Sequence, residues 1–496
     1  MPVKTFQDFR NGVDRRKSEQ IVDQLGLYEC KNAFINSGFA VKKRFGMDKI
    51  SNALTADSVG LFEYNEALYT VRHGTAGAQT LAGYGIGASG TISTSFYTLA
   101  LPDPDDAANK VLQVWQFLVF NNNLYVVVEY VDNTIVHHYG TSAQMIAGTN
   151  VVITDVNCPN GKSVCVHDSK IYGVEPDASN PAFVKYSATE DPTNWSKVKD
   201  SSGALGLPAG LEASGNEFVN AVVSYRGFLC VFMENSIQLW KTNPNPGLTK
   251  LDTTVDNAFV EYHRTIAPIN EDVFYLNSTG IHSVGQKLYT DTMSTMDIGS
   301  PITDLILSSL SSSYEPKAIF YPGKNQYILI NNTDVFVFTH SAKSGLAAWS
   351  RWTIPNEAKD IVSYRNFMFI RIKEGSDEHI YSFNPNSFQD TTASSTASID
   401  LEIASSFNSL DQPGVWKQIY GSDVMFTGTA DLQHKWDSRS PSSFTTAFSL
   451  SDDTRPGVLI PVELMTTEVG FRVTQSDNSD FQLNGLTYYY NNLGLF

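Results

Sequence analysis

Residues 222–229 read Val222-Val223-Ser224-Tyr225-Arg226-Gly227-Phe228-Leu229, and residues 361–368 repeat the pattern as Ile361-Val362-Ser363-Tyr364-Arg365-Asn366-Phe367-Met368. Each copy holds an apolar run, an aromatic residue, a short polar turn and a second apolar run. That order predicts two antiparallel strands joined by a tight turn. A hairpin that recurs within one chain indicates an array of similar units.

Looser copies of this hairpin set the length of the repeat. The residue before each turn serves as a marker, and the mean step between markers from residue 64 to residue 364 is about 50 residues. A strand-rich period of this length predicts a β-propeller built from four-stranded blades. We expect about seven blades, and the spacing is compatible with six to eight. The markers are Tyr64, Phe120, His167, Tyr225, Asn270, Tyr321 and Tyr364.

Composition divides this all-β chain into four segments. Residues 1–50 lack the hairpin pattern and are expected to form an extended N-terminal arm. Residues 51–390 carry the markers and form the predicted propeller. A run of Thr, Ala and Ser at residues 391–399 is typical of a linker. Short apolar runs separated by turn residues predict a C-terminal β-sandwich-like domain over residues 400–496.

Few stretches suggest anything other than strands. Residues 18–27 and residues 302–311 are the best helix candidates, and Ser300-Pro301 offers a start for the second. The Gly-rich residues 74–95 are expected to form an inserted loop.

The charge of the chain is unevenly distributed. The net charge is −17, but residues 1–50 carry +4 and the remaining body −21. A surplus of carboxylates excludes a general nucleic-acid binder, because such proteins attract phosphate with Lys and Arg. The basic arm predicts docking onto an acidic surface, either of a partner or of the chain's own body. The candidate docking residues are Arg10, Arg15, Arg16, Lys42, Lys43 and Arg44.

Cysteine usage and hydropathy indicate the compartment. The four cysteines form no Cys-x-x-Cys pair, which favours free thiols in a protein assembled in a reducing cytoplasm. No apolar run approaches eighteen residues, and no secretory signal opens the chain, so we expect neither a membrane span nor a signal peptide.

No catalytic motif stands out, and we expect no enzymatic activity, cofactor or metal. The chain lacks Gly-x-Ser-x-Gly, a phosphate-binding loop, His-Glu-x-x-His and the sialidase-type repeat. His137 and His138 are adjacent, so on a strand they point to opposite faces and do not form a metal pair. The turn at residues 191–196 is interpreted as a structural blade corner around Trp195.

Five segments resemble the structural tail proteins of short-tailed bacteriophages. They lie in order along most of the chain, at residues 8–16, 43–46, 187–196, 225–240 and 481–490. The resemblance implies a non-enzymatic tail nozzle or hub, present in the virion tail after assembly in the host cytoplasm. It also implies a homo-oligomeric, six-fold ring below the portal and adaptor proteins. Such a ring extends the DNA channel, helps to retain the packaged genome and anchors tail fibres or spikes.

The acidic body is compatible with a DNA conduit, since like charge keeps a passing duplex from adhering to the wall. The alternative reading is a receptor-binding or glycan-degrading propeller of a phage tail. In that case the cluster Tyr488-Tyr489-Tyr490 would stack on sugars, although burial in a strand core explains it equally well. A cellular scaffold propeller is disfavoured, because the blades lack Trp-Asp endings. Deletion of residues 1–46 is expected to leave the propeller folded but to impair assembly.

Overall fold

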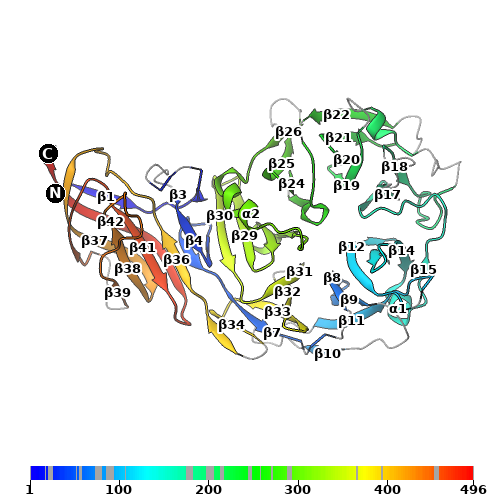
Figure 1. The fold of residues 1–496 in the computed structure, drawn as a ribbon, viewed down its shortest axis with the longest axis horizontal. Coiled ribbons are helices and arrows are strands. Elements are labelled where there is room, and N and C mark those ends of the chain that lie inside the picture. The colour runs from blue at the N-terminus through cyan, green and yellow to red at the C-terminus, as the bar shows by residue number, and fades with distance from the viewer. Residues whose placement is uncertain are drawn as a thin grey trace.

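The computed structural model describes residues 2–16, 18–19, 26–51, 53–54, 58–72, 81–84, 94–106, 108–174, 182–196, 206–212, 217–243, 249–256, 258–269, 272–286, 293–364, 367–392, 395–451 and 457–494. Strands predominate in these residues, and a seven-bladed β-propeller adjoins a β-sandwich (Figure 1). The helical segments are α1 (Ser142–Ala147), α2 (Thr303–Ser309), η2 (Ala209–Leu211), η4 (His263–Thr265), η5 (Ser300–Ile302) and η6 (Pro322–Lys324). Among the described residues, no helix is long and apolar enough to cross a membrane.

The first four blades follow one another along the chain. In blade 1, β9 pairs in parallel with β11, while the other blades are antiparallel throughout. In blade 3, a bridge between Val184 and Leu207 adds to the three strands. The strands are β8 (Val59–Tyr64), β9 (Ala67–Arg72), β10 (Leu81–Tyr84) and β11 (Thr94–Ala100) in blade 1; β12 (Val111–Phe120), β13 (Asn123–Tyr130), β14 (Ile135–Gly140) and β15 (Val151–Val152) in blade 2; β16 (Val164–His167), β17 (Lys170–Val174) and β18 (Val184–Tyr186) in blade 3; and β19 (Val219–Tyr225), β20 (Phe228–Met233), β21 (Ser236–Lys241) and β22 (Lys250–Asp256) in blade 4.

Blades 5 to 7 complete the ring, and the last blade borrows its outer strand from the N-terminal segment. The strands are β23 (Ala267–Ile269), β24 (Asp272–Asn277), β25 (Gly280–Gln286) and β26 (Met293–Met296) in blade 5; β27 (Lys317–Tyr321), β28 (Gln326–Asn331), β29 (Asp334–Ser341) and β30 (Leu346–Thr353) in blade 6; and β31 (Glu357–Tyr364), β32 (Phe367–Glu374), β33 (Asp377–Asn384) and β7 (Gly46–Lys49) in blade 7.

The predicted markers fall at the ends of the first strands of the blades, which confirms both the repeat and the count of seven. The turn after Tyr225 holds Arg226 and Gly227 at φ of 51° and 80°, as a two-residue hairpin with positive φ at both positions requires. Asn270 lies outside the described residues, directly after β23. The other markers are the last residues of β8, β12, β16, β19, β27 and β31.

Alternation of side chains along the second strand of each blade explains why the blades form a ring. Successive residues point to opposite faces of a sheet. On β20, Leu229 and Val231 therefore pack toward blade 3, while Cys230 and Phe232 pack toward blade 5. The seven hydrophobic clusters of the described residues each join two neighbouring blades, including blade 7 to blade 1 through Phe369. A strand that is buried on both faces is apolar throughout, which is the pattern that the hairpin repeats show.

The ring is closed by β7, which pairs antiparallel with β33. Met47 lies opposite Phe383, is almost fully buried and joins the core between blades 6 and 7. The chain therefore enters the propeller as the outer strand of the last blade and then begins the first blade with β8. Closure by a distant strand links the start of the propeller to its end.

The described residues of the extended N-terminal segment form short strands that dock onto the chain's own body. Most of these strands pair with partners hundreds of residues away, so the local pattern did not indicate them. Removing residues 1–46 would take strands from the sandwich. The strands in this segment are β1 (Val3–Phe6), β2 (Gly12–Val13), β3 (Gly26–Leu27), β4 (Glu29–Lys31), β5 (Ala33–Ile35), β6 (Val41–Lys43) and β7.

The sandwich combines N-terminal strands with residues 401–494. One sheet has the order β40-β37-β42-β6-β5, with β1 also paired to β42; in the other, β4 leads to β36, β41, β38 and β39. Phe6 and Phe471 meet edge to face in the core at a centroid distance of 6.3 Å. The C-terminal strands are β36 (Leu401–Ala404), β37 (Trp416–Gly428), β38 (Ala430–Lys435), β39 (Phe448–Leu450), β40 (Ile460–Thr466), β41 (Gly470–Gln475) and β42 (Phe481–Gly494).

Blade 6 and one sandwich sheet form a continuous sheet, because β4 pairs with β30 on one side and with β36 on the other. One hydrophobic cluster also extends from blades 5 and 6 into the sandwich and includes Trp349. Gly12 packs against the backbone of Trp349, and a Cβ there would lie 2.4 Å from the Trp349 carbonyl oxygen. The two domains thus share a sheet and a core, and the first and last described strands both lie in the sandwich (Figure 1).

The two predicted helices, the inserted loop and the linker compare with the structure as follows. The helix at residues 302–311 is confirmed as α2, preceded by η5. Of the helix predicted at residues 18–27, Gly26 and Leu27 form β3, and residues 20–25 lie outside the described residues. The predicted inserted loop at residues 74–95 also lies mostly outside them. The predicted linker contributes to a hairpin of β34 (Gln389–Thr391) and β35 (Thr396–Ser398).

Candidate functional site

The three N-terminal arginines predicted for docking pair with carboxylates of their own chain. Arg10 Nη2 lies 2.5 Å from Asp8, and Arg16 Nη2 lies 2.6 Å from Asp14. Arg15 binds Glu29 at 2.7 Å, and its guanidinium stacks over the Tyr28 ring. The Arg16 side chain keeps 54% of its surface exposed, so of these three it is the most available to a partner.

The three basic residues at positions 42–44 differ sharply in exposure. Lys42 lies 3.1 Å from Asp480 at the surface. The Lys43 ammonium donates a hydrogen bond to the Asp477 carbonyl at 2.7 Å, and burial lowers the pKa of Lys43 to about 8. Arg44 is 1% exposed. Lys43 and Arg44 therefore contact the chain's own body, which is one of the two docking surfaces that the basic segment suggested, and docking of the segment onto a partner stays a prediction.

Arg44 instead fastens the N-terminal segment to the propeller. Its two terminal nitrogens bind both oxygens of Asp390, at 2.9 Å and 2.5 Å. It also donates to the side-chain oxygen of Asn32 and to the backbone carbonyl of Thr353, each at 3.0 Å. A buried ion pair is tolerated when hydrogen bonds satisfy both partners, as they do here.

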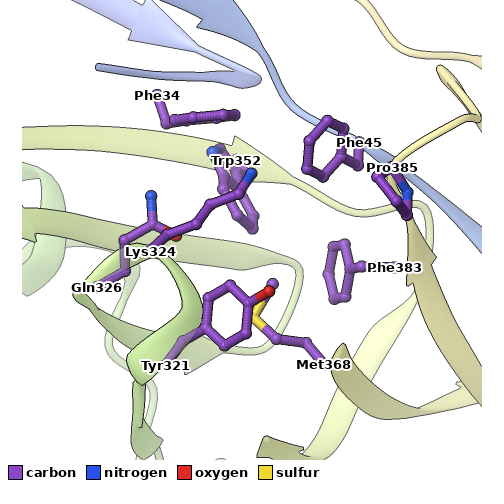
Figure 2. A pocket seen from close by; sticks show the side chains of 9 residues that line it. All are labelled: Phe34, Phe45, Tyr321, Lys324, Gln326, Trp352, Met368, Phe383 and Pro385. Carbon is purple, nitrogen blue, oxygen red and sulfur yellow. The ribbon is translucent and has the colours of Figure 1, made fainter. Parts of the chain in front are cut away.

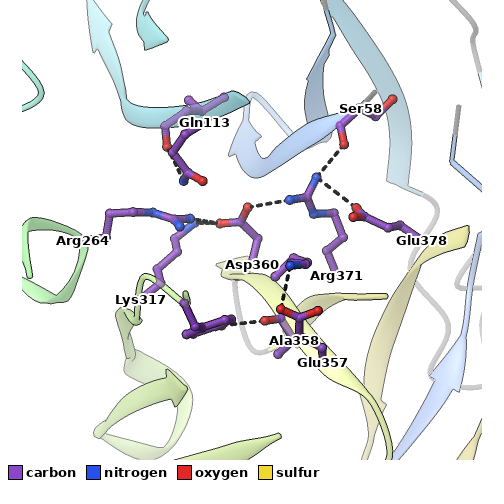
Figure 3. Close-up of polar contacts among 12 residues, drawn as sticks. Ser58, Gln113, Arg264, Lys317, Glu357, Ala358, Asp360, Arg371 and Glu378 are labelled. Carbon is purple, nitrogen blue, oxygen red and sulfur yellow. Dashed lines mark hydrogen bonds and ion pairs between the residues drawn. The ribbon is translucent and has the colours of Figure 1, made fainter. Parts of the chain in front are cut away.

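A second charged cluster surrounds Asp360 on the first strand of blade 7 (Figure 3). Asp360 on β31 is 1% exposed and accepts from Arg264 at 2.5 Å and from Lys317 at 2.6 Å. Arg371 on β32 lies 3.3 Å from the other Asp360 oxygen and donates to the Ser58 carbonyl at 2.9 Å. These contacts tie blades 5, 6 and 7 to the start of blade 1.

The electrostatics of this cluster follow from burial and from its surplus of cations. Burial alone would raise the pKa of the Asp360 carboxyl, but the charges of Lys317, Arg264 and Arg371 overcome it, so the pKa lies below its ordinary value. Nearby, burial raises the pKa of Glu315 to about 7 against the opposing charge of Arg264. We call the cluster of Asp360, Arg264, Lys317 and Arg371 the ionic clasp.

An aromatic pocket lies between blades 6 and 7 and the N-terminal segment (Figure 2). Its inner recess has a volume of about 40 Å³, and a wider cavity of about 530 Å³ shares its walls. The Lys324 ammonium lies 4.0 Å from the centroid of Phe34 and 3.7 Å from that of Phe45. The recess is lined by Phe34, Phe45, Tyr321, Lys324, Gln326, Trp352, Met368, Phe383 and Pro385.

The histidine pair is structural. His137 contacts the Tyr125 hydroxyl at 2.7 Å and His138 contacts the Tyr130 hydroxyl at 3.0 Å, so the two rings serve different neighbours. Burial lowers the pKa of His137 to about 4 and that of His138 to about 3, and both rings are neutral at pH 7. No group of His, Cys, Asp or Glu among the described residues is arranged to hold a metal ion.

The turn at residues 191–196 forms the structural corner that the sequence indicated. Trp195 is 1% exposed and its indole N–H donates to the Pro192 carbonyl at 3.0 Å. Asp191 accepts from the Thr193 backbone N–H, while Asp155 accepts from that of Trp195. The corner packs into the core between blades 2 and 3.

Neither the ionic clasp nor the aromatic pocket was predicted from the sequence. One signal for the clasp is present: Asp360 directly precedes the apolar part of a strand, at Ile361-Val362. A carboxylate on a buried strand requires cationic partners; Arg371 lies opposite Asp360 in the same hairpin, but Lys317 and Arg264 are distant in the sequence.

No protein-family model matches the chain, and no curated protein matches it. Among solved structures, it is similar to the Pan2 WD40 domain of Neurospora crassa, with 11% identity and a TM-score of 0.38 over 69% of this chain and 95% of that one. A prolyl endopeptidase structure gives 11% identity and a TM-score of 0.38, covering 72% of this chain and 54% of that chain. The AfRom2 CNH domain gives 11% identity and a TM-score of 0.32, covering 60% of this chain and 91% of that chain. Likeness at this level carries no functional argument.

Proposed function

We propose that this chain is a non-enzymatic structural subunit of a phage tail: a nozzle or hub that forms a homo-oligomeric, six-fold ring. In this proposal the ring continues the DNA channel below the portal and adaptor, helps to retain the packaged genome and anchors fibres or spikes. It is assembled in the host cytoplasm and resides in the virion tail. The proposal rests on the resemblance of the five segments and on the build of the molecule.

The observation that carries the proposal is the joint between the domains. The sheet that passes from β30 through β4 to β36, together with the shared core, joins the propeller to the sandwich and should limit their relative motion. The buried Arg44–Asp390 pair adds a second fastening between the N-terminal segment and the hairpin that follows blade 7. A subunit that bears load in a ring benefits from such a joint, because relative domain motion is otherwise the default.

Charge supports the same proposal. The chain carries −17 overall, and the N-terminal basic residues are largely neutralised within the chain. A ring of such subunits presents negative charge to a passing duplex, and like charge limits adhesion.

The glycan-binding alternative loses its main support. Tyr488 is fully buried, with its hydroxyl 3.0 Å from His434 Nδ1, and Tyr490 is 5% exposed. Only Tyr489 of the three faces outward to any extent. A single ring is a weak platform for stacking a sugar chain.

The proposal is tested by the mass of the purified full-length chain in solution. Native mass spectrometry over a range of protein concentrations is expected to reveal a six-subunit species, and purified virions are expected to contain the chain in a matching copy number. A protein that stays monomeric at every concentration and is absent from virions would refute the proposal.

A further inference from the structure

The Lys324 ammonium in the aromatic pocket forms no ion pair with the described residues. Its ammonium lies against two aromatic rings, and among the described residues no carboxylate lies within ion-pair distance of it. Burial, and then the positive charge of Lys42, lowers the pKa of Lys324 to about 7. A negative charge placed beside Lys324 would relieve both effects.

Gln326 adds an unsatisfied acceptor to the same pocket. Its side chain is 1% exposed, and its amide nitrogen donates to the Thr339 hydroxyl at 3.0 Å. Its Oε1 atom is buried and accepts no hydrogen bond from the part of the chain that the structure describes. An unsatisfied buried acceptor is destabilising, and a ligand N–H or O–H would satisfy it.

The recess beside these groups is apolar and small. A volume of about 40 Å³ holds roughly three groups the size of a water molecule or a methyl, because one needs about 10–15 Å³. Its walls are mainly aromatic, with Trp352 and Phe383 meeting at a centroid distance of 5.8 Å. The wider cavity leads outward past Asn36, Ser37 and Lys42.

We propose that this pocket binds an N-acylated apolar α-amino acid group. The carboxylate would pair with Lys324 near Lys42, the amide N–H would donate to Gln326 Oε1, and a side chain of three carbons would fill the recess. The acyl end would point into the wider cavity. The same chemistry exists as a free small molecule and as the carboxyl-terminal residue of a polypeptide, and the site does not depend on ring formation.

Isothermal titration calorimetry with N-acetyl-L-valine tests the proposal on the full-length protein. The matched ligand is N-acetyl-L-valinamide, which keeps the N–H and the isopropyl group but lacks the charge. We expect the acid to bind at least about tenfold more tightly than the amide, and its affinity to fall as the pH rises above 7 and Lys324 loses its proton. Absence of binding by the acid at millimolar concentration, or equal affinities for acid and amide, would overturn the proposal.

Two variants assign the contacts. Lys324→Met keeps the apolar stem but removes the charge, and should weaken the acid about tenfold while leaving the amide unchanged. Gln326→Met should weaken both ligands, because both donate the N–H. Lys241→Met is the control, at the exposed last residue of the otherwise buried strand β21, and should change neither. Equal losses in Lys241→Met and Lys324→Met would contradict the site, and thermal melting of each variant verifies folding.

A titration with a peptide distinguishes the two sources of the ligand. A pentapeptide that ends in valine with a free carboxylate is compared with N-acetyl-L-valine. Tighter binding of the peptide assigns the occupant to a polypeptide terminus that fills the wider cavity as well. Equal affinity assigns it to a free small molecule.

Discussion

Asp360 supplies the carboxylate that three surrounding cations require. Arg264 and Arg371 are each 6% exposed and Lys317 15%, so water does little to screen them. Burying charge is costly unless it is paired, and removing one partner leaves the others uncompensated. The inner strands of the propeller therefore depend on this single side chain.

Asp360→Asn should lower the free energy of unfolding by about 3 kcal/mol or more, because Arg264 and Lys317 lose their ion-pair partner and Arg371 keeps only Glu378. Urea denaturation followed by tryptophan fluorescence measures the change. Glu357→Gln is the control: its partner Lys359 is 29% exposed, and loss of that surface pair should cost under about 1 kcal/mol. Equal effects of the two variants would show that the clasp does not stabilise the ring.

The stability that Asp360 provides should also depend on pH. Since its pKa in the folded protein lies below the ordinary value, the contribution is complete above about pH 4 and is lost as the pH falls further.

The pKa of Glu315 is shifted upward, in the opposite direction to that of Asp360. Its pKa rises from an ordinary 4.5 to about 7 in the folded protein, so folding favours the protonated form. The contribution to stability is full below pH 4.5 and declines as the pH rises to 7. Glu315→Gln cannot ionise, and should therefore be more stable than the parent at pH 8 by about 1–2 kcal/mol, with a smaller difference at pH 5. Urea denaturation at both pH values measures this, and a variant less stable than the parent at pH 8 would contradict the assignment.

At the scale of elements, closure of the ring depends on β7. Its four residues pair with β33, and the Met47 backbone N–H also donates to Asp390 at 3.2 Å. Because β7 precedes blade 1 in the chain and lies in blade 7, it joins the two ends of the propeller.

Met47→Pro should open the ring at blade 7. Proline removes the Met47 backbone N–H that donates to Asp390, and a sheet tolerates proline only where the N–H faces solvent. Hydrogen exchange measured by mass spectrometry should then become faster in β33 and β8, with β20 in blade 4 much less affected. Met47→Leu conserves volume and serves as the control. Unchanged exchange in β33 would mean that β7 does not hold the ring closed.

The hairpins were predictable because their information is local. A turn such as Arg226-Gly227 and its flanking apolar runs lie within a dozen residues, and six of the seven markers fall at strand ends in the described chain. Strands β2 and β3 have two residues each and pair with each other, and β2 also pairs with the distant β30, so no local period indicates them. Arg371 lies opposite Asp360 in the hairpin of β31 and β32, but Lys317 and Arg264 lie 43 and 96 positions from Asp360, beyond the reach of motif reading.

At the scale of the whole molecule, the two domains form one elongated body with both described ends of the chain in the sandwich (Figure 1). In the proposed ring, this geometry would leave the propeller available for contacts with other subunits. The net charge of −17 predicts weak interaction with DNA even at low salt, because like charge limits adhesion of a duplex to the proposed channel wall.

Cryo-electron microscopy of the assembled protein tests the proposed ring. We expect six-fold rings with a central channel wide enough for a DNA duplex, in which each subunit retains the propeller and sandwich as one rigid body. Monomeric particles, or rings without a channel, would contradict it.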